Sequence, residues 1–334
     1  MRAVRYFDAG VVREGTLTDD GQVLAEPAPA GSPALEGLIT GLFTDHHVHL
    51  QLVDHTLLAA SRLGRVLDLG AEPGWIRGVV VHNSGDSGAR SADHAGSSAS
   101  GQVSPELREP IVAYAGPFLT APGGYPADRA WAPTGSVREV TDAADATAAV
   151  HEVAAADAAV VKIIANSAAG PVLDDDTVQA IVDAAVAEGL LVVAHAEGPG
   201  QAQRMARLRA DILAHAPFTE RLTDAEIDAQ VAAVSWISTL AVHDAAHQQI
   251  ATDNVRRFAA AGGTVLYGTD MGNGDTPVDL RAAEVAALRE AGVDGIRLFT
   301  ALAPLPATDG GALLLSPSDD PLLARPLTPA DLEA

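Results

Sequence analysis

Two histidines one residue apart, His47 and His49, are the first residues of this chain whose types and spacing suggest chemistry. They close the stretch 44–49, which follows a run of small and apolar residues. In a β-strand, residues i and i+2 point to the same face, so both imidazoles would lie side by side at a strand end. A borderline-soft cation such as Zn²⁺ binds such a pair, and the pattern therefore indicates a metal site.

Further polar residues lie in or directly after short apolar runs. Lys162 lies within Ala159–Ile164, and His195, His215 and Asp270 each follow an apolar run of their own. Singly, such residues have simpler explanations, because a buried histidine can bond to a backbone carbonyl and a lysine can pair with an acid. With His47 and His49 they make six such residues on five predicted strands, which makes a joint functional role the better interpretation, since active sites of α/β barrels collect at strand ends.

The alternation of short apolar strands with Ala-rich helical stretches predicts an α/β fold, a (β/α)₈ TIM barrel, over residues 37–304. Helical spacing is clear at Asp175–Glu188 and Asp279–Ala291, and Gly189 lies where a C-terminal cap is expected. Residues 1–36 and 305–334 predict a small β accessory part. The expected strands are Leu38–Phe43, Arg65–Leu69, Ile111–Ala115, Ala159–Ile164, Leu190–Ala194, Asp211–Leu213, Ala233–Ile237 and Thr264–Tyr267.

Composition narrows the class of protein. The chain has 334 residues with 48% hydrophobic content, no cysteine and a net charge of −23. The absence of cysteine excludes disulfides, thiolate nucleophiles and Cys-based zinc sites. The acidic balance argues against nucleic-acid and membrane partners. Because we find neither a signal peptide nor a membrane-spanning run, we expect a cytoplasmic protein with a small-molecule substrate, and we leave a homo-oligomer open.

Taken together, the set resembles the amidohydrolase superfamily: D-x-H-x-H on the first strand, Lys on the fourth, His on the fifth and sixth, and Asp on the eighth. The stretches 115–124, 161–164, 194–198 and 267–274 are similar to its imidazolonepropionase-like and Xaa-Pro dipeptidase-like branch. Two features depart from the family. The stretch 41–44 stands where Pro-Gly is usual, and only residues 312–315 look like a strand of the usual C-terminal β-sandwich, which we therefore expect to be abbreviated.

The resemblance implies a binuclear centre of two divalent ions, most often zinc. His47, His49 and Asp270 would hold one ion and His195 and His215 the other, bridged by Lys162 carboxylated with CO₂. Asp270 would also move the proton, as the catalytic residue. A metal-activated hydroxide would then cleave an amide or related carbonyl bond of an acyl-amino acid or a dipeptide-like molecule.

Two other functions stay open. One is a mononuclear enzyme that uses His47, His49, His195 and Asp270 on a cyclic amide, a lactone or a deamination substrate. The other is an inactive barrel used only for binding. The loops Ser84–Gly101 and Gly123–Pro133 are the segments that we expect to select the substrate.

Other motifs carry less weight. His243 and His247 have the i, i+4 spacing of a zincin helix, but we interpret them as the solvated face of a short helix. The stretch 85–89 nearly matches a nucleophile elbow but lacks its final glycine, and we reject it. Asp45 is expected to support a ligand or a turn, and His46 to face away from His47 and His49.

Overall fold

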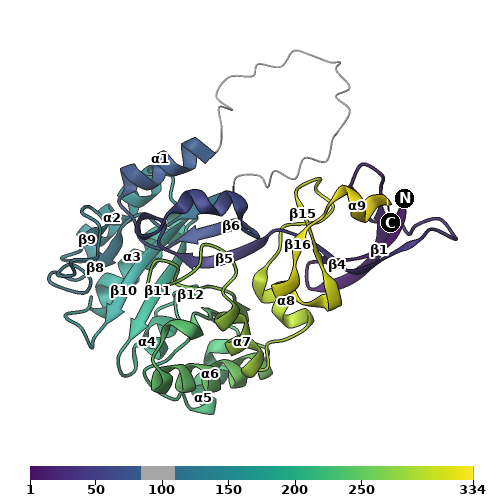
Figure 1. Cartoon of the computed structure of the whole chain (residues 1–334). Helices are drawn as coiled ribbons and strands as arrows, with labels where there is room; N and C mark the ends of the chain where they lie inside the picture. Colours follow the sequence, from purple (N-terminus) through teal and green to yellow (C-terminus); the bar gives the residue numbers. More distant parts are fainter. Residues whose placement is uncertain (84–109, 334) are drawn as a thin grey trace.

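The computed structural model of the chain describes residues 1–83 and 110–333, whose strands form three sheets. One six-stranded sheet is built from both ends of the chain, and we call it the terminal sheet. Two sheets of seven and three strands come from the middle of the chain, and with their helices we call them the parallel body. Figure 1 shows the terminal sheet set to one side of the parallel body, with both chain ends on it.

The terminal sheet has its own hydrophobic core. Val4, Leu17, Ile39 and Leu315 meet in one buried cluster, and Leu332 of the last helix packs against it. β1 and β4 pair in parallel, and the other neighbours are antiparallel. The two ends of the chain thus pack into one sheet and one core. The strand order is β16 (Arg325–Pro326), β15 (Leu313–Ser316), β4 (Ala34–Gly41), β1 (Arg2–Asp8), β2 (Val11–Leu17) and β3 (Val23–Leu24), and the helix is α9 (Pro329–Glu333).

The first parallel strand lies one element later than the sequence predicted. Most of the predicted strand Leu38–Phe43 belongs to β4, which pairs with β1 and β15 in the terminal sheet. The strand that opens the parallel body is β5 (Phe43–Val48), directly after it. That prediction was wrong because residues 38–43 are apolar in both settings, and pairing with the distant β15 decides between them.

The parallel body contains the other seven predicted strands, and each begins and ends within three residues of its expected bounds. Every strand pair in it is parallel. Two short strands were missed. The seven-stranded sheet has the order β14 (Val265–Leu266), β13 (Ser235–Ile237), β12 (Ile212–Leu213), β11 (Leu191–Glu197), β10 (Val160–Asn166), β8 (Phe118–Thr120) and β9 (Val137–Glu139); the three-stranded sheet has the order β5, β6 (Leu63–Asp68) and β7 (Ile111–Tyr114).

Backbone hydrogen bonds connect both edges of the three-stranded sheet to the seven-stranded sheet. On one side, Val48 bridges Met271 in parallel, and the His46 amide donates to the Tyr267 carbonyl at 3.0 Å. On the other, the amide of Ala159 donates to the carbonyl of Tyr114 at 2.8 Å. The carboxyl ends of strands from both sheets therefore lie at one end of the parallel body.

Helices follow the strands and cover the body from outside (Figure 1). Helix α3 confirms its prediction at both ends: Asp174 caps it by accepting from the amide of Thr177, and Gly189 ends it with φ of 70°. Among the described residues, no helix is long and apolar enough to cross a membrane. The helices are α1 (Pro73–Asn83), α2 (Ala143–Ala155), α3 (Asp175–Glu188), α4 (Gln201–Arg207), α5 (Asp224–Val231), α6 (Ala245–Ala260), α7 (Ala282–Glu290) and α8 (Ile296–Leu302).

Strand alternation in β10 explains how a lysine comes to be buried. Val161 and Ile163 join the large core shared with the helices. The alternate residue Val160 belongs to a smaller cluster formed by side chains from β6 and β11 to β13, on the opposite face of the strands. Lys162 and Ile164 continue that inner row and line a cavity at the carboxyl end.

Candidate metal centre

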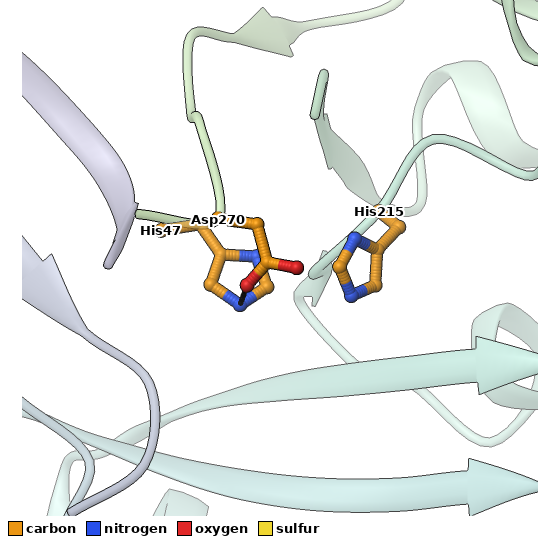
Figure 2. Close-up of side chains that lie close together, drawn as sticks. All are labelled: His47, His215 and Asp270. Carbon is orange, nitrogen blue, oxygen red and sulfur yellow. Dashed lines mark ion pairs between the residues drawn. The ribbon is translucent and has the colours of Figure 1, made fainter. Parts of the chain in front are cut away.

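Three side chains from different strand ends bring their ligand atoms together at the carboxyl end of the parallel body. These are His47 in β5, His215 after β12 and Asp270 after β14, whose ligand atoms all lie within 4.8 Å of one another. Figure 2 shows the Asp270 carboxylate between the two imidazole rings. All three are buried. We call these residues the donor cluster, and it confirms that the fold brings three of the predicted ligands to one point.

The orientation of His47 leaves a lone pair facing Asp270. The carbonyl of Ala214 can only accept, so the His47 Nδ1 at 2.8 Å carries the proton and donates it. Burial lowers the pKa of His47 well below its ordinary value, with help from Lys162 and against the pull of Asp270, so the ring is neutral. Its Nε2 is thus an acceptor only 3.2 Å from the ionised Oδ1 of Asp270. Without a proton or a metal ion between them, two acceptors at this distance repel each other.

His49 faces the same carboxylate oxygen. Its Nε2 lies 3.2 Å from Oδ1 of Asp270, and its Nδ1 lies 3.3 Å from the carbonyl oxygen of Gly70. Burial acts to lower the pKa of His49, but the hydrogen bond to Asp270 and that residue's charge raise it above its ordinary value. Positive charge is therefore favoured beside Asp270, supplied either by a proton or by a metal ion.

The Asp270 carboxylate is held in place by its own backbone. Asp270 has φ of 53°, a left-handed conformation that Asp and Asn adopt more readily than most residues. The side-chain Nδ2 of Asn273 donates a hydrogen bond to Oδ2 of Asp270 at 2.8 Å. Burial raises the pKa of Asp270, yet the facing histidines lower it well below its ordinary value, so the group is ionised. Asp270 thus offers a fixed anionic oxygen.

His195 lies beside the donor cluster but outside its group of three. Its ring centroid is 4.8 Å from that of His215, and its Nε2 lies 2.9 Å from Oε2 of Glu197. The pKa of Glu197 is lowered, chiefly by this hydrogen bond, so the ionised carboxylate accepts from Nε2–H. Because Glu197 occupies Nε2, Nδ1 of His195 is the ring nitrogen left for a metal ion.

Lys162 is the only lysine of the chain, among 21 basic residues that are otherwise all arginine. It is 1% exposed, and the described residues give it no hydrogen bond. Burial lowers the pKa of Lys162 to about 7, against the opposing charges of Asp270 and Asp68. A substantial fraction of the amine is thus neutral near pH 7, the form that reacts with CO₂.

Asp45 supports the strand that carries His47. Its Oδ1 accepts from the amides of His47 at 3.0 Å and Thr269 at 3.1 Å, and its Oδ2 accepts from the Thr269 hydroxyl at 2.6 Å. Burial raises the pKa of Asp45 to about 7. We call Asp45 and Thr269 the brace, because they tie β5 to the segment that carries Asp270. The expected supporting role of Asp45 agrees with this geometry.

His46 points elsewhere, as predicted. Its Nδ1 donates to the Tyr267 carbonyl at 2.9 Å, and burial lowers its pKa to about 4.

The prediction for the second histidine pair, His243 and His247, was wrong in detail. His243 precedes α6, whose N-cap is Asp244, and α6 runs for 16 residues. His243 lines the cavity and stacks on Phe218 with ring centroids 4.1 Å apart, so it is a wall of the site instead of a solvated helix face.

A cavity of about 410 Å³ opens above the donor cluster. Tyr125 and Trp131 from the predicted loop Gly123–Pro133 line it, whereas the predicted loop Ser84–Gly101 lies outside the described residues. Sequence reasoning missed Glu197, His243 and Asn273 as lining residues. Glu197 and Asn273 had a usable signal, since they follow predicted ligands by two and three positions. The cavity's remaining aromatic lining comes from Phe118 and Phe218.

Solved hydrolase structures share this fold at low sequence identity. A putative prolidase from Bifidobacterium longum aligns with a TM-score of 0.67 and 18% identity over 97% of this chain and 91% of that chain. A Xaa-Pro dipeptidase with bound methionine aligns with a TM-score of 0.65 and 15% identity over 94% of this chain and 93% of that chain. Bottromycin amidohydrolase aligns with a TM-score of 0.63 and 18% identity over 100% of this chain and 87% of that chain. No family model and no curated protein matches the sequence. The chain therefore has the fold of these amidohydrolase structures, in agreement with the resemblance of its motifs.

Proposed function

We propose that this chain, which has an amidohydrolase fold, is a metal-dependent hydrolase that cleaves an amide bond of a small molecule. The observation that carries the proposal is the donor cluster, in which neutral imidazole nitrogens face a buried, ionised carboxylate. Imidazole nitrogen with carboxylate oxygen is a donor set that suits divalent zinc. The proposal includes a closed (β/α)₈ barrel, supported by the parallel pairing and by the hydrogen bonds at both sheet edges.

In this proposal, His47, His49 and Asp270 hold one divalent ion, and His195 and His215 hold a second one. When bound, such ions lower the pKa of water and polarise a carbonyl group. The Lys162 side chain lies in the same cavity, where its Nζ lone pair would add to the carbon of CO₂. The neutral amine forms a C–N bond as one C–O π bond of CO₂ breaks, and the loss of one N–H proton then gives an anionic carbamate. The carbamate would supply oxygen ligands at a point where an ammonium would repel metal ions.

The chain's own residues would orient the reaction and move its proton. Asp270 is ionised and fixed at the edge of the cavity, so its carboxylate would accept the proton of the attacking nucleophile. It would then pass that proton to the amine that leaves, which the departure of an amine requires. The hydrogen bonds from His47 and His49 to backbone carbonyls keep their rings directed at the centre.

A mononuclear enzyme acting on a cyclic amide, a lactone or a deamination substrate is the second candidate. One observation favours it: within the described residues, the ligand atoms of His47, His215 and Asp270 form one close group, which is enough to hold a single ion. The number of metal ions and the fate of Lys162 distinguish the two candidates.

Because Lys162 is the only lysine of the chain, carbamate formation at this residue can be observed directly. The metal-reconstituted enzyme would be incubated with ¹³C-labelled bicarbonate, and carbamate carbon would be observed by NMR. Only the Lys162 amine and the α-amino group of Met1 can give this signal, and Lys162→Ala removes the first alone. We expect two metal ions per chain, a carbamate signal that disappears in Lys162→Ala, and hydrolysis on a panel of amides, esters and lactones.

Lys162→Ala should bind fewer ions and lose most activity, with partial recovery when a short-chain carboxylate is added. One ion per chain without a Lys162 carbamate, together with an active Lys162→Ala variant, would establish the mononuclear candidate. A wild-type protein that binds no metal and hydrolyses nothing on the panel would instead indicate a barrel used for binding.

A further inference from the structure

Glu197 is a carboxylate in the wall of the cavity that the proposed metal centre does not use as a ligand. It ends β11, and its Oε2 accepts from Nδ2 of Asn166 at 2.7 Å and from Nε2 of His195 at 2.9 Å. Its Oε1 accepts no hydrogen bond within the part of the chain that the structure describes. The side chain is 27% exposed, and it lines the cavity. One anionic oxygen of Glu197 is thus free to meet a ligand.

The described cavity wall offers no arginine. Its lining residues include the carboxyl groups of Glu197 and Asp270 and one buried lysine, Lys162. Arg129 is the neighbouring guanidinium, 5.5 Å from the ring centroid of Tyr125, but it pairs with Asp128 and does not line the cavity. A substrate carboxylate would therefore find no bidentate partner on this wall.

Aromatic rings line the same cavity as Glu197. The Tyr125 ring centroid is 5.8 Å from that of His195 and 6.0 Å from that of Trp131, and Trp131 meets Phe118 edge-on at 6.1 Å. Burial, together with the charges of Asp270 and Glu197, raises the pKa of Tyr125 to about 12. The wall thus combines the carboxylate oxygen of Glu197 with aromatic faces, and both attract a cation.

From this arrangement we propose that Glu197 is a specificity-determining residue that selects substrates carrying a protonated amino group. The ammonium would lie between Oε1 of Glu197 and the rings of Tyr125 and Trp131. This inference rests on the proposed function for the identity of the cavity as a substrate site. It narrows the substrate class to amides of amino-bearing molecules, and it disfavours acyl-amino acids, which present only a carboxylate.

Binding can be measured apart from turnover. Calorimetry on the metal-reconstituted protein would compare hexyltrimethylammonium with its neutral counterpart 1-hexanol, and the quaternary cation cannot ligate a metal ion. We expect the cation to bind at least about tenfold more tightly, from ion pairing and cation–π contact in a partly desolvated site. Glu197→Gln should remove most of that preference and leave hexanol affinity within about twofold. Glu188→Gln removes an exposed carboxylate from α3 and should change neither affinity.

The outcomes separate the two proposals. An ammonium probe that fails to bind, or binds no better than hexanol, overturns the role of Glu197. So does a Glu197→Gln variant that keeps the cation preference. Because Glu197 also contacts His195, metal content is measured in each variant, and the ratio of the two affinities within one variant cancels any general change of the site. Absence of hydrolysis with intact cation preference would contradict the proposed hydrolase alone.

Discussion

Asp45 and Asp270 both contact His47 but have different kinds of partner. The Asp45 carboxylate receives two backbone amides and a hydroxyl, so the brace satisfies it from within the protein. Asp270 receives one amide donor, from Asn273, and otherwise faces imidazole nitrogens. Burial acts to raise the pKa of both carboxyl groups, but the histidines around Asp270 reverse the effect there.

This difference separates a structural acid from a functional one. A buried carboxylate surrounded by donors stabilises the fold, and its removal leaves those donors unpaired. A buried carboxylate that faces several imidazole nitrogens can instead share a metal ion with them. Burial alone therefore does not identify a site, because Asp45 is at least as buried as Asp270.

The largest expected effect is on turnover at the donor cluster. Asp270→Asn introduces a residue that also adopts the left-handed backbone conformation, but it removes the anionic ligand and proton carrier. We expect kcat/KM for an amide substrate to fall by about a thousandfold or more. The melting temperature of the metal-free protein should stay within a few degrees, as for His47→Ala. A variant that keeps wild-type turnover would remove Asp270 from the mechanism.

Substitution in the brace should mainly lower the stability of the fold, in contrast to substitution of Asp270. Asp45→Ala leaves the hydroxyl of Thr269 and two buried amides without their acceptor. The free energy of unfolding should fall by about 2–5 kcal/mol, measured by urea denaturation. Thr269→Val removes only the hydroxyl and should cost about 1 kcal/mol. If Asp45→Ala is as stable as the wild type, the brace is not a stabilising feature.

Glu284 extends the brace region and gives a pH test. It accepts from the amides of Leu240 at 2.9 Å and Ala241 at 2.7 Å, and burial raises its pKa above the ordinary 4.5 despite these bonds. The folded state then binds more protons than the unfolded chain above about pH 4.5, so this contribution to stability falls as pH rises towards the folded-state pKa.

Glu284→Gln cannot titrate, so its stability relative to the wild type should improve between about pH 5 and about pH 8. Each unit by which the pKa is raised corresponds to about 1.4 kcal/mol. Urea denaturation of both proteins at the two pH values measures the change. A difference that is constant with pH would show that Glu284 titrates normally in the folded protein.

The smallest effect is expected where a neutral group supports Asp270. Asn273→Ala removes the one amide donor to Oδ2 and leaves the carboxylate less firmly oriented. We expect metal affinity, measured by chelator competition, and kcat/KM to fall by about tenfold each. Asn273→Asp is the matched comparison, because it keeps the size and adds a like charge, and it should bind metal differently from Asn273→Ala. Unchanged metal affinity in both variants would assign Asn273 no role in the centre.

The sequence by itself determined the residue types and the side of the strand on which they lie. Period-two alternation places His47 and His49 together and directs His46 away, and those relations depend only on local backbone geometry. The helical pattern of α3, with its capping residues, is local in the same way. The apolar runs that precede His195, His215 and Asp270 identified strands whose ends now lie at one end of the parallel body.

Only the tertiary structure decided which partners those residues meet. That Asp270 faces His47, and that Glu197 lies beside an aromatic wall, depends on contacts between segments far apart in the sequence. The placement of β4 in the terminal sheet depends likewise on β15, more than 270 residues later. Periodicity reports whether a residue is buried, whereas the partner across the interior sets its protonation and its chemistry.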